Sequence, residues 1–318
     1  MSTTNAEGNQ VHANKIVLVT RRTRLEELIA RHNTPGQARF YIEHLGADYV
    51  DYETEHRTYQ AAIRTTEEQL VRFGRVQRLD RAFLSNFIFP EEAPVVVLGQ
   101  DGLVANTLKY LAGQQVVGVN PDPSRWDGVL LPFRVTDLSR LMPEVLSNRR
   151  LRKTVTMAQA SLSDGQTLFA VNDLFIGVRS HVSARYEIAL GKTRERHSSS
   201  GVIVSTGLGS SGWFRSVLTG AMGIAGSAGQ ECQALRDRGF AWDTRHLYFS
   251  VREPFPSRAT QTSLVLGRVT DRQPLELVSQ MPENGVIFSD GIEGDCLEFT
   301  SGMHATIQPA ARQGVLVH

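Results

Sequence analysis

The stretch that decides the fold is residues 95–106, which read Val-Val-Val-Leu-Gly-Gln-Asp-Gly-Leu-Val-Ala-Asn. The four apolar residues at 95–98 predict a buried strand of a parallel sheet. The strand ends at Gly99, and a helical pattern begins just after Gly102. Backbone N–H groups converge at such a helix start, and the helix dipole favours phosphate there. One acid, Asp101, lies in this turn, although Asp-Gly is also a common turn pair. An acid beside a phosphate site needs a role, such as accepting a proton or helping to hold a metal.

Strands and helices alternate on both sides of this stretch. Strands are expected at residues 15–20, 49–52 and 116–119. Helices are expected after the capping residue Thr23 and at residues 37–45, within 59–73 and at 137–146. This alternation favours a parallel sheet covered on both faces.

From residue 151 onward, short strands and turn signals replace the alternating pattern. Residues 154–162 and 166–170 flank Ser-Asp-Gly, which predicts a hairpin. Further strands are expected at residues 174–178, 186–190, 202–205, 247–251, 263–267, 275–279, 286–289, 297–300, 305–308 and 315–317. One helix interrupts them at residues 213–222. The density of strands predicts a β sandwich.

Two domains follow from this change of pattern. An N-terminal α/β domain with a parallel sheet is expected at residues 15–147. A C-terminal β-rich sandwich domain is expected at residues 148–304. The tail at residues 305–318 could return to the first domain.

The composition limits the class of protein. The formal net charge of +1 argues against a nucleic-acid binder or a binder of acidic membranes. The two cysteines, Cys232 and Cys296, form no CxxC, which suits a reducing compartment and gives no structural zinc site. No apolar run is long enough to cross a bilayer, and the polar leader before Lys15 lacks the charged start of a signal peptide. We therefore expect a cytoplasmic protein without nucleic-acid or membrane partners.

A second glycine-rich turn occupies residues 205–212, which read Ser-Thr-Gly-Leu-Gly-Ser-Ser-Gly. Its glycines let a backbone approach a ligand closely, and its four hydroxyls offer donors to phosphate oxygens. A flexible Gly/Ser loop is the alternative interpretation. Its place between an apolar strand and an amphipathic helix makes an anion or nucleotide site equally plausible.

Three polar turns complete the candidate residues. Asn172-Asp173 lies between two apolar runs, and Asn120 opens an Asn-Pro-Asp-Pro segment after a strand, where open parallel sheets bind ligands. Residues 289–291 read Ser-Asp-Gly. Each is an ordinary turn when taken alone. No histidine pair has metal-ligand spacing and Gly-x-Ser-x-Gly is absent, so the sequence supports neither a zinc nor a serine hydrolase.

Taken in this order, the motifs resemble the NAD kinase family, and especially its mitochondrial-type branch. Gly-Gln-Asp-Gly at residues 99–102 is similar to the family's Gly-Gly-Asp-Gly loop, and residues 118–120 are similar to its Gly-x-Asn segment. Asn172-Asp173 resembles the family's Asn-Glu pair, and residues 205–213 resemble its hydroxyl-rich loop. The late Asp-Gly at 290–291 and Ser-Val-Arg-Glu-Pro at 250–254 also match. The likeness covers residues 15 to 310, and the order of the motifs is more specific than any one of them.

The resemblance implies an NAD kinase-like fold that binds a dinucleotide between an α/β domain and a β-rich domain. It implies ATP-dependent transfer of a phosphoryl group to the adenosine ribose 2′-hydroxyl of NAD, with Mg²⁺, and a homodimer. Asp101 would be the general base. The implied nucleotide-binding residues are Gly99, Gly102 and Asn120 in the first domain, Asn172 and Asp173 at the adenosine of NAD, Ser211, Gly212 and Trp213 in its pocket, and Thr206, Gly209 and Ser210 at the donor phosphates. It implies no protein residues dedicated to a metal.

Three residues depart from the family pattern: Gln100 replaces a glycine, Leu103 replaces a threonine and Asp173 replaces a glutamate. A glycine at position 100 would matter if the loop needed positive φ there. Two alternatives to an NAD kinase follow. One is a dinucleotide-binding regulatory protein with weakened catalysis, and the other is a kinase whose acceptor is a sugar or lipid hydroxyl.

Overall fold

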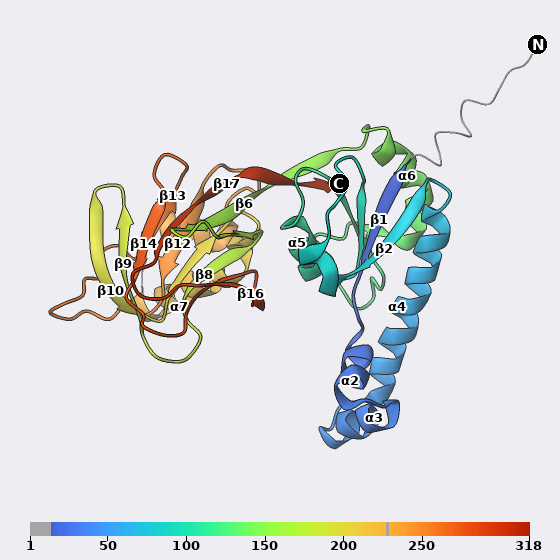
Figure 1. The fold of residues 1–318 in the computed structure, drawn as a ribbon, viewed down its shortest axis with the longest axis horizontal. Helices are drawn as coiled ribbons and strands as arrows, with labels where there is room; N and C mark the ends of the chain where they lie inside the picture. The colour runs from blue at the N-terminus through green and yellow to red at the C-terminus, as the bar shows by residue number, and fades with distance from the viewer. Residues whose placement is uncertain (1–13, 227–228) are drawn as a thin grey trace, which may run out of the picture. The chain divides into compact units, whose positions relative to one another are not determined.

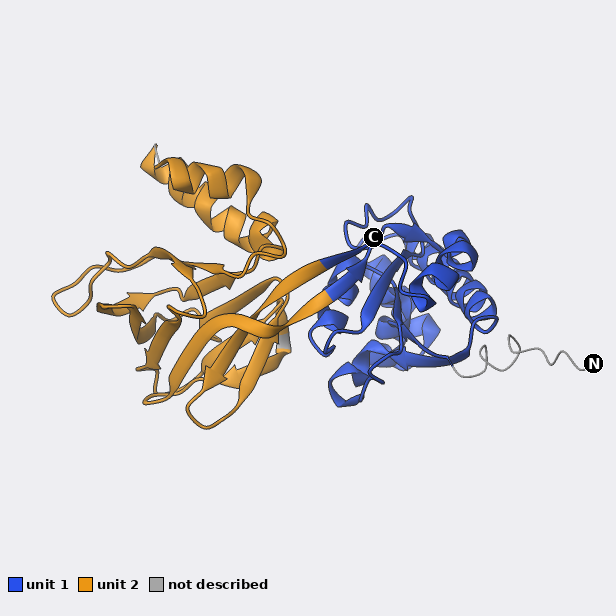
Figure 2. Cartoon of the chain, turned by 90° about the horizontal axis from the view of Figure 1, so that it is seen from above, with its two compact units in different colours: residues 1–153, 315–318 blue, residues 154–314 orange. Residues whose placement is uncertain are grey.

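The computed structural model describes residues 14–226 and 229–318. They divide into two compact units (Figure 2). Unit 1 comprises Met1–Lys153 and Val315–His318, and unit 2 comprises Thr154–Gly314. Residues 1–13 of the polar leader lie outside the described residues.

Unit 1 is built on a parallel sheet. Its strands are β1 (Lys15–Thr20), β2 (Arg75–Asp80), β3 (Val95–Leu98), β4 (Gln115–Asn120), β5 (Phe133–Arg134) and the last residues of β17 (His304–Val317). They are ordered β17-β4-β3-β1-β2, with β5 also paired to β4. The expected strands at 15–20, 95–98 and 116–119 are confirmed, and β2 is an additional strand. Val315 and Leu316 of β17 pair with the start of β4, so the chain's last residues belong to this sheet.

Helices α4 (Tyr49–Leu70), α5 (Asp101–Leu108) and α6 (Leu138–Leu146) pack against the sheet of unit 1. Helices α2 (Arg24–His32) and α3 (Pro35–His44) pack on each other and on α4 instead (Figure 1). Unit 1 also has the short 3₁₀ helices η1 (Arg81–Asn86) and η2 (Val135–Asp137). Thr23 caps α2 in a capping box with Glu26, as its sequence position suggests.

The strand expected at residues 49–52 is wrong, because these residues begin the 22-residue helix α4. The Asp48 carboxylate accepts the backbone N–H of Val50 and so caps the helix start. Buried residues then recur at helical spacing, including Tyr59, Ile63 and Leu70. Local β propensity in Tyr-Val-Asp-Tyr misled the prediction, since the tertiary contacts of the whole helix outweigh it.

The strand order of this sheet indicates where a ligand would bind, namely at the carboxyl ends of the strands. The chain passes from β1 to β2 on one side and then returns to β3 on the other side of β1. In parallel sheets, ligands bind outside the carboxyl ends of the strands where the order reverses in this way. Leu98, at the end of β3, lies at that edge together with the ends of β1 and β4.

Unit 2 contains two antiparallel sheets. One is ordered β13 (Leu266–Val269), β12 (Leu247–Val251), β11 (Val202–Ser205), β8 (Asp173–Val178), β15 (Gly285–Ser289), β16 (Ile292–Glu298). The other is ordered β10 (Thr193–Ser199), β9 (Ala184–Leu190), β14 (Leu275–Ser279), β17, and β6 (Arg152–Leu162) pairs with both β17 and β7 (Thr167–Ala170).

The two sheets of unit 2 share one hydrophobic core. Ile176 and Phe249 from the first sheet pack in one cluster with Tyr186, Leu277 and Ile307 from the second. The predicted β sandwich is therefore confirmed, and so is the hairpin of β6 and β7. The predicted strands at 305–308 and 315–317 prove to be parts of one strand, β17.

Two helices accompany the sandwich: α7 (Trp213–Ala225) and α8 (Gln230–Arg238), preceded by the 3₁₀ helix η3 (Gly209–Ser211). Phe214, Leu218 and Leu235 join them in a small cluster. The sequence predicted α7 but missed α8 and β10. Across the described ranges of both units, no helix has the length and apolar character needed to cross a bilayer.

Candidate functional site

The turn between β3 and α5 in unit 1 has an unstrained backbone. Gln100 is the N-cap residue of α5, with φ −117° and ψ 163°. This is ordinary extended geometry, so glutamine fits at a position where the resembling family has glycine. Leu103 packs over the turn, and a Cβ at Gly99 would lie 2.8 Å from its Cδ2 atom. Gly102 is exposed and has no heavy atom near its Cβ position, so its open side is free for a ligand.

Asp101 is the first residue of α5, and backbone amides fix its carboxylate. Oδ1 accepts the N–H of Leu130 at 2.7 Å, and Oδ2 accepts the N–H of Val129 at 3.2 Å. Each oxygen keeps a further lone pair, because a carboxylate offers about four acceptor positions. The carboxylate is therefore held in one orientation and can still accept a proton or a hydroxyl donor.

Asn120, at the end of β4, shapes the loop that supplies those amides. Its Nδ2 donates to the carbonyl of Trp126 at 2.8 Å, and its Oδ1 accepts the N–H of Asp122 at 3.0 Å. Gly128 has φ +67°, and a Cβ there would lie 2.8 Å from the Asn120 amide nitrogen. Asn120 is buried and acts in this structure through the loop that holds Asp101.

A network of ion pairs, not evident from the sequence, connects the same loop to α4. The Arg125 guanidinium donates two hydrogen bonds, of 2.6 and 3.2 Å, to the Asp51 carboxylate. Arg24 also donates to Asp51 at 2.8 Å and contacts Glu55. The hydrogen bonds from Arg125 and Arg24 lower the pKa of Asp51 to about 2. The network therefore joins α2, α4 and the Asp101 loop.

Tyr59 of α4 lies at the carboxyl ends of β1 and β3, where the strand order reverses. Its hydroxyl donates to the carbonyl of Leu98 at 2.7 Å and accepts the N–H of Arg21 at 3.0 Å, so it joins the carboxyl ends of β3 and β1. Burial raises the pKa of Tyr59 to about 12. The phenol thus stays protonated and keeps its hydrogen bond to Leu98, next to the turn that bears Asp101.

In unit 2, Asn172 and Asp173 lie at the start of β8, where Asp290 organises their backbone. The Asp290 carboxylate accepts the N–H groups of Val171, Asn172 and Asp173 at 3.0, 2.6 and 3.3 Å. Asp290 has φ 53°, a left-handed conformation that aspartate tolerates better than most residues. The late Asp-Gly motif is therefore a structural support for the Asn-Asp pair.

Asp173 carries a perturbed carboxyl group. Desolvation by burial raises its pKa to about 7, helped by the nearby charge of Asp290 and opposed by hydrogen bonding with Ser205. Its Oδ1 atom is buried and has no hydrogen-bond partner among the described residues. A buried acceptor without a partner is costly, so a ligand hydroxyl or amino group would find a ready acceptor here.

Asp173 lines a cavity of about 340 Å³ with aromatic walls. The ring of Phe175 is stacked between Trp213 and Phe288, with centroid distances of 5.7 and 6.1 Å. The cavity is lined by Asp173, Phe175, Val178, Arg179, Trp213, Phe288 and Gly291. Flat aromatic walls with one carboxyl suit a heteroaromatic ring attached to a polar group.

The second glycine-rich turn wraps the backbone of Asn172. The Thr206 hydroxyl donates to the carbonyl of Val171 at 2.5 Å, and the Ser210 hydroxyl donates to that of Gly207 at 2.7 Å. A Cβ at Gly209 would lie 2.2 Å from the Asn172 carbonyl oxygen, so only glycine fits there. Thr206 and Ser210 are buried, and in this structure their hydroxyls shape the loop.

Exposed residues of this turn follow the buried ones. Ser211, Gly212 and Trp213 are accessible, and of these Trp213 faces the aromatic cavity.

The predicted residues thus form two groups, each within its own unit. Gly99, Asp101, Gly102 and Asn120 gather in unit 1, and the others gather in unit 2. Local patterning did not reveal Tyr59, Asp51, Arg125, Phe175 or Phe288, although the register of a β8–β15 pair would have put the two phenylalanines opposite each other.

Mg²⁺ would need ligands beyond the protein. Among the described residues, no group of three or more His, Cys, Asp or Glu side chains could hold a metal ion. Mg²⁺ in phosphoryl-transfer sites is commonly held by one or two carboxylates together with substrate phosphates. Asp101 fits such a partial role, with the nucleotide supplying the remaining oxygens.

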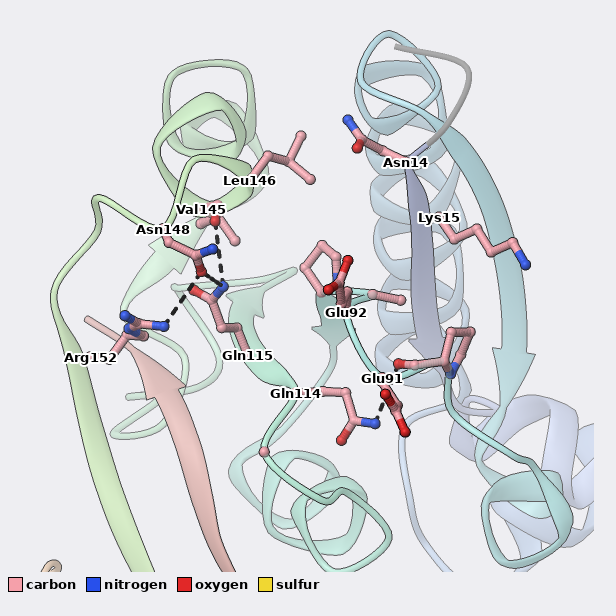
Figure 3. A pocket seen from close by; sticks show the side chains of 14 residues that line it. Asn14, Lys15, Glu91, Glu92, Gln114, Gln115, Val145, Leu146, Asn148 and Arg152 are labelled. Atoms are coloured by element: carbon pink, nitrogen blue, oxygen red, sulfur yellow. Dashed lines mark hydrogen bonds between the residues drawn. The ribbon is translucent and has the colours of Figure 1, made fainter. Parts of the chain in front are cut away.

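A separate polar cavity of about 520 Å³ lies in unit 1 beside the first residues of β1, β3 and β4 (Figure 3). There the amide nitrogen of Gln115 donates to the Val145 carbonyl at 3.4 Å and to the Asn148 side chain at 2.7 Å. Lys15 and Gln115 begin their strands, so this cavity lies at the amino-terminal edge of the sheet. It is therefore not part of the site around Asp101.

Comparisons with known proteins identify the fold. No protein-family model matches the chain, and no curated protein matches its sequence. Among solved structures, an NAD kinase from Archaeoglobus fulgidus in complex with ATP is similar, with TM-score 0.55 and 15% identity over 96% of this chain and 93% of that one. Yeast NADH kinase complexed with NADH is similar with TM-score 0.58 and 15% identity, over 96% of this chain and 83% of that one. The chain has the fold of these NAD kinases, and identities this low establish the fold alone.

Proposed function

We propose that this protein is an ATP-dependent kinase that phosphorylates NAD at the 2′-hydroxyl of the adenosine ribose to give NADP. The observation that carries the proposal is the geometry of Asp101. This acid stands at the start of α5, directly after β3, and two backbone amides hold its carboxylate. The NAD kinase fold and the ordered motifs of the sequence support the same reaction.

The proposed step is a direct phosphoryl transfer. Asp101 accepts the proton of the ribose 2′-hydroxyl as the hydroxyl oxygen forms a bond to the γ-phosphorus of ATP. The bond between that phosphorus and the β–γ bridging oxygen breaks, and ADP leaves with the electron pair. A positioned general base contributes about 10² to 10⁴ in rate. Mg²⁺ held mainly by the nucleotide phosphates would supply neutralisation of phosphate charge, which such transfers require together with positioning.

Local features of each unit support nucleotide binding. In unit 1, the open face of Gly102 and the start of α5 offer a place for phosphate. In unit 2, the aromatic cavity of Phe175 and Trp213 suits the adenine ring, and the unpartnered Oδ1 of Asp173 suits a ribose hydroxyl. The shorter reach of aspartate relative to glutamate is compatible with a bridging water.

A second candidate is a dinucleotide-binding regulatory protein of the same fold. One observation favours it: both carboxylate oxygens of Asp101 already accept backbone N–H groups, so this side chain also has a structural role in holding the loop. A kinase with a sugar or lipid acceptor would share the Asp101 chemistry. The polar, dinucleotide-sized set of motifs favours NAD over a lipid.

The test is incubation of the purified protein with ATP, Mg²⁺ and, separately, NAD, NADH and a panel of sugars. Formation of NADP or NADPH supports the proposal. Tight NAD binding without any product would replace it with the regulatory protein, and phosphorylation of a sugar alone would change the acceptor. Membership of the mitochondrial-type branch, a homodimeric state and a cytoplasmic location stay predictions of the sequence.

A further inference from the structure

A second polar hollow lies in unit 2, apart from the residues assigned above. Its volume is about 520 Å³, and none of its lining residues belongs to the Asp173 cavity. It is lined by Ser183, Arg185, Arg196, His197, Ser198, Phe255, Ser257, Ala259, Thr260 and Gln280. No acidic residue is among them, so two arginines set its charge.

The two arginines lie on one face of the β9–β10 ribbon. Arg185 of β9 pairs across the ribbon with Ser198, and Arg196 lies two residues before Ser198 on β10. Diagonal neighbours of this kind are about 7–8 Å apart, within reach of long side chains. Both guanidinium groups can therefore turn toward one anion between them.

Arg194, a nearby arginine on β10, differs from Arg185 and Arg196 in its partners. Arg194 contacts both Glu187 and Glu276, so two carboxylates neutralise it. Glu187 stands opposite Arg196, but its carboxylate contacts Arg194 instead. Within the described ranges, neither Arg185 nor Arg196 forms an ion pair. Their forked donors match phosphate oxygens in geometry.

The other wall is a preorganised loop that is hydrogen-bonded along the outer edge of β10. The N–H of Phe255 donates to the Ser198 carbonyl at 2.8 Å, and the N–H of Gln261 donates to that of Arg196 at 2.9 Å. The Thr260 hydroxyl donates to the Phe255 carbonyl at 2.7 Å. These bonds hold the loop at the rim without a ligand.

Phe255 gives this wall an exposed aromatic ring. Its side chain is 63% exposed, although burial of a phenylalanine is favourable. Prolines on both sides of Phe255 restrict the local backbone. A ring beside two arginines that lack carboxylate partners offers a stacking surface and phosphate donors at one place.

We propose that this hollow binds a nucleotide, with the phosphates between Arg185 and Arg196 and the base stacked on Phe255. This site is distinct from the proposed acceptor and donor sites, and its binding does not depend on the proposed kinase activity. Its ligand class is a nucleoside diphosphate, whose two phosphates match the two guanidinium groups.

The test is hydrogen–deuterium exchange of the full chain with and without ADP, followed over residues 183–199 and 254–262. ADP should protect both segments. The variant Arg185→Ala/Arg196→Ala should weaken this protection by about tenfold or more in ADP concentration for each arginine removed, since bonds to charged groups are strong. Phe255→Leu should weaken it by a smaller factor while it keeps the loop.

Arg258→Ala is the matched control, because Arg258 lies in the same loop but does not line the hollow. It should leave protection by ADP unchanged. Absence of protection in the wild-type chain would overturn the proposal. Equal weakening by Arg258→Ala would reduce the effect to general charge, and protection by inorganic pyrophosphate as strong as by ADP would overturn the assignment to a nucleotide.

Discussion

The Asp101 carboxylate and the backbone amide of Leu130 form a 2.7 Å hydrogen bond, although the two residues are 29 positions apart in the chain. The acid at the start of α5 is thus oriented by the loop that follows β4. The same loop is held by Asn120 from within and by Asp51 from α4. The integrity of the loop can therefore be tested at Asp51, without changing the carboxylate of Asp101.

Replacement Asp101→Asn should greatly lower turnover while NAD affinity stays within a few-fold of wild type. An amide cannot accept the ribose proton, and the expected loss is about 10² to 10⁴ in kcat. Steady-state kinetics and calorimetric NAD binding measure the two effects. Glu92→Gln, at an exposed acid that lines the separate polar cavity of unit 1, is the control, and activity retained by Asp101→Asn would remove Asp101 as the base.

Replacement Asp51→Asn should loosen the loop and lower stability. The folded pKa of about 2 lies below the usual value, so the stabilisation is present above about pH 4 and is lost as the pH falls toward 2. Because the side chains are partly exposed, we expect a loss of only about 0.2 to 1 kcal/mol at pH 7. Denaturant unfolding at pH 7 and pH 3 measures it, and turnover should fall in parallel.

Glu43→Gln is the matched control for Asp51. Glu43 pairs with Arg39 within α3 and has no bond to the Asp101 loop. It should alter stability slightly and leave turnover unchanged. Equal loss of turnover in both variants would show that the effect is not transmitted through Arg125.

Replacement Asp173→Asn should remove the loss of stability that Asp173 causes in the wild-type protein as the pH rises. The folded pKa of about 7 lies above the unfolded value, so between roughly pH 4 and 7 the native state holds a proton that the unfolded chain has lost. The free energy of unfolding contributed by Asp173 therefore falls as the pH rises through this window. From pH 5 to pH 8, the variant should gain about 1–3 kcal/mol relative to wild type.

Unfolding curves at several pH values measure the effect of Asp173. Asp164→Asn is the control, because hydrogen bonds with Gln166 lower the pKa of Asp164, so the stability that Asp164 contributes changes only at acid pH and is constant from pH 5 to 8. A constant difference between Asp173→Asn and wild type from pH 5 to 8 would contradict the raised pKa.

Replacement Trp213→Ala should weaken NAD binding because it removes one wall of the aromatic cavity. Stacking of a base on an aromatic ring contributes about 1–3 kcal/mol, so the Kd should rise by roughly 5- to 150-fold. Trp213→Phe should retain most of the affinity, and Ile224→Ala, at an exposed position of the same helix, should retain all of it. Calorimetric titration with NAD measures the series, and unchanged affinity in Trp213→Ala would exclude this cavity as the adenine site.

Local sequence patterns predicted the elements whose signals are strong over short distances. Val95–Leu98 is a run of four buried residues, and Gly165 at the hairpin turn has φ +91°. Thr23 caps α2 as expected, and Glu26 completes a capping box with it. Such features depend on a few adjacent residues, so they can be read without the fold.

Features that depend on tertiary contacts could not be read in this way. The sequence predicted a strand and a separate shorter helix within the 22 residues of α4. Their common helical periodicity is clear only from the residues that face the sheet. Strand β10 was missed because its exposed residues are polar or charged and its buried ones are Glu195, His197 and Ser199. Asp290 contacts the Asn172-Asp173 backbone, and Tyr59 contacts Leu98 near Asp101. Both contacts join residues that are far apart in the sequence, so no local pattern predicts them.

The contact between Asp290 and the amide of Asn172 spans 118 residues of chain. Such a long loop must close before the carboxylate can reach these N–H groups, and loop closure of this kind slows folding. The turn at Val171 to Asp173 thus acquires its native shape only when β15 has paired with β8. Recovery of nucleotide binding should consequently be among the last events when unit 2 refolds, after the local hairpins of β6 with β7 and β9 with β10 have formed.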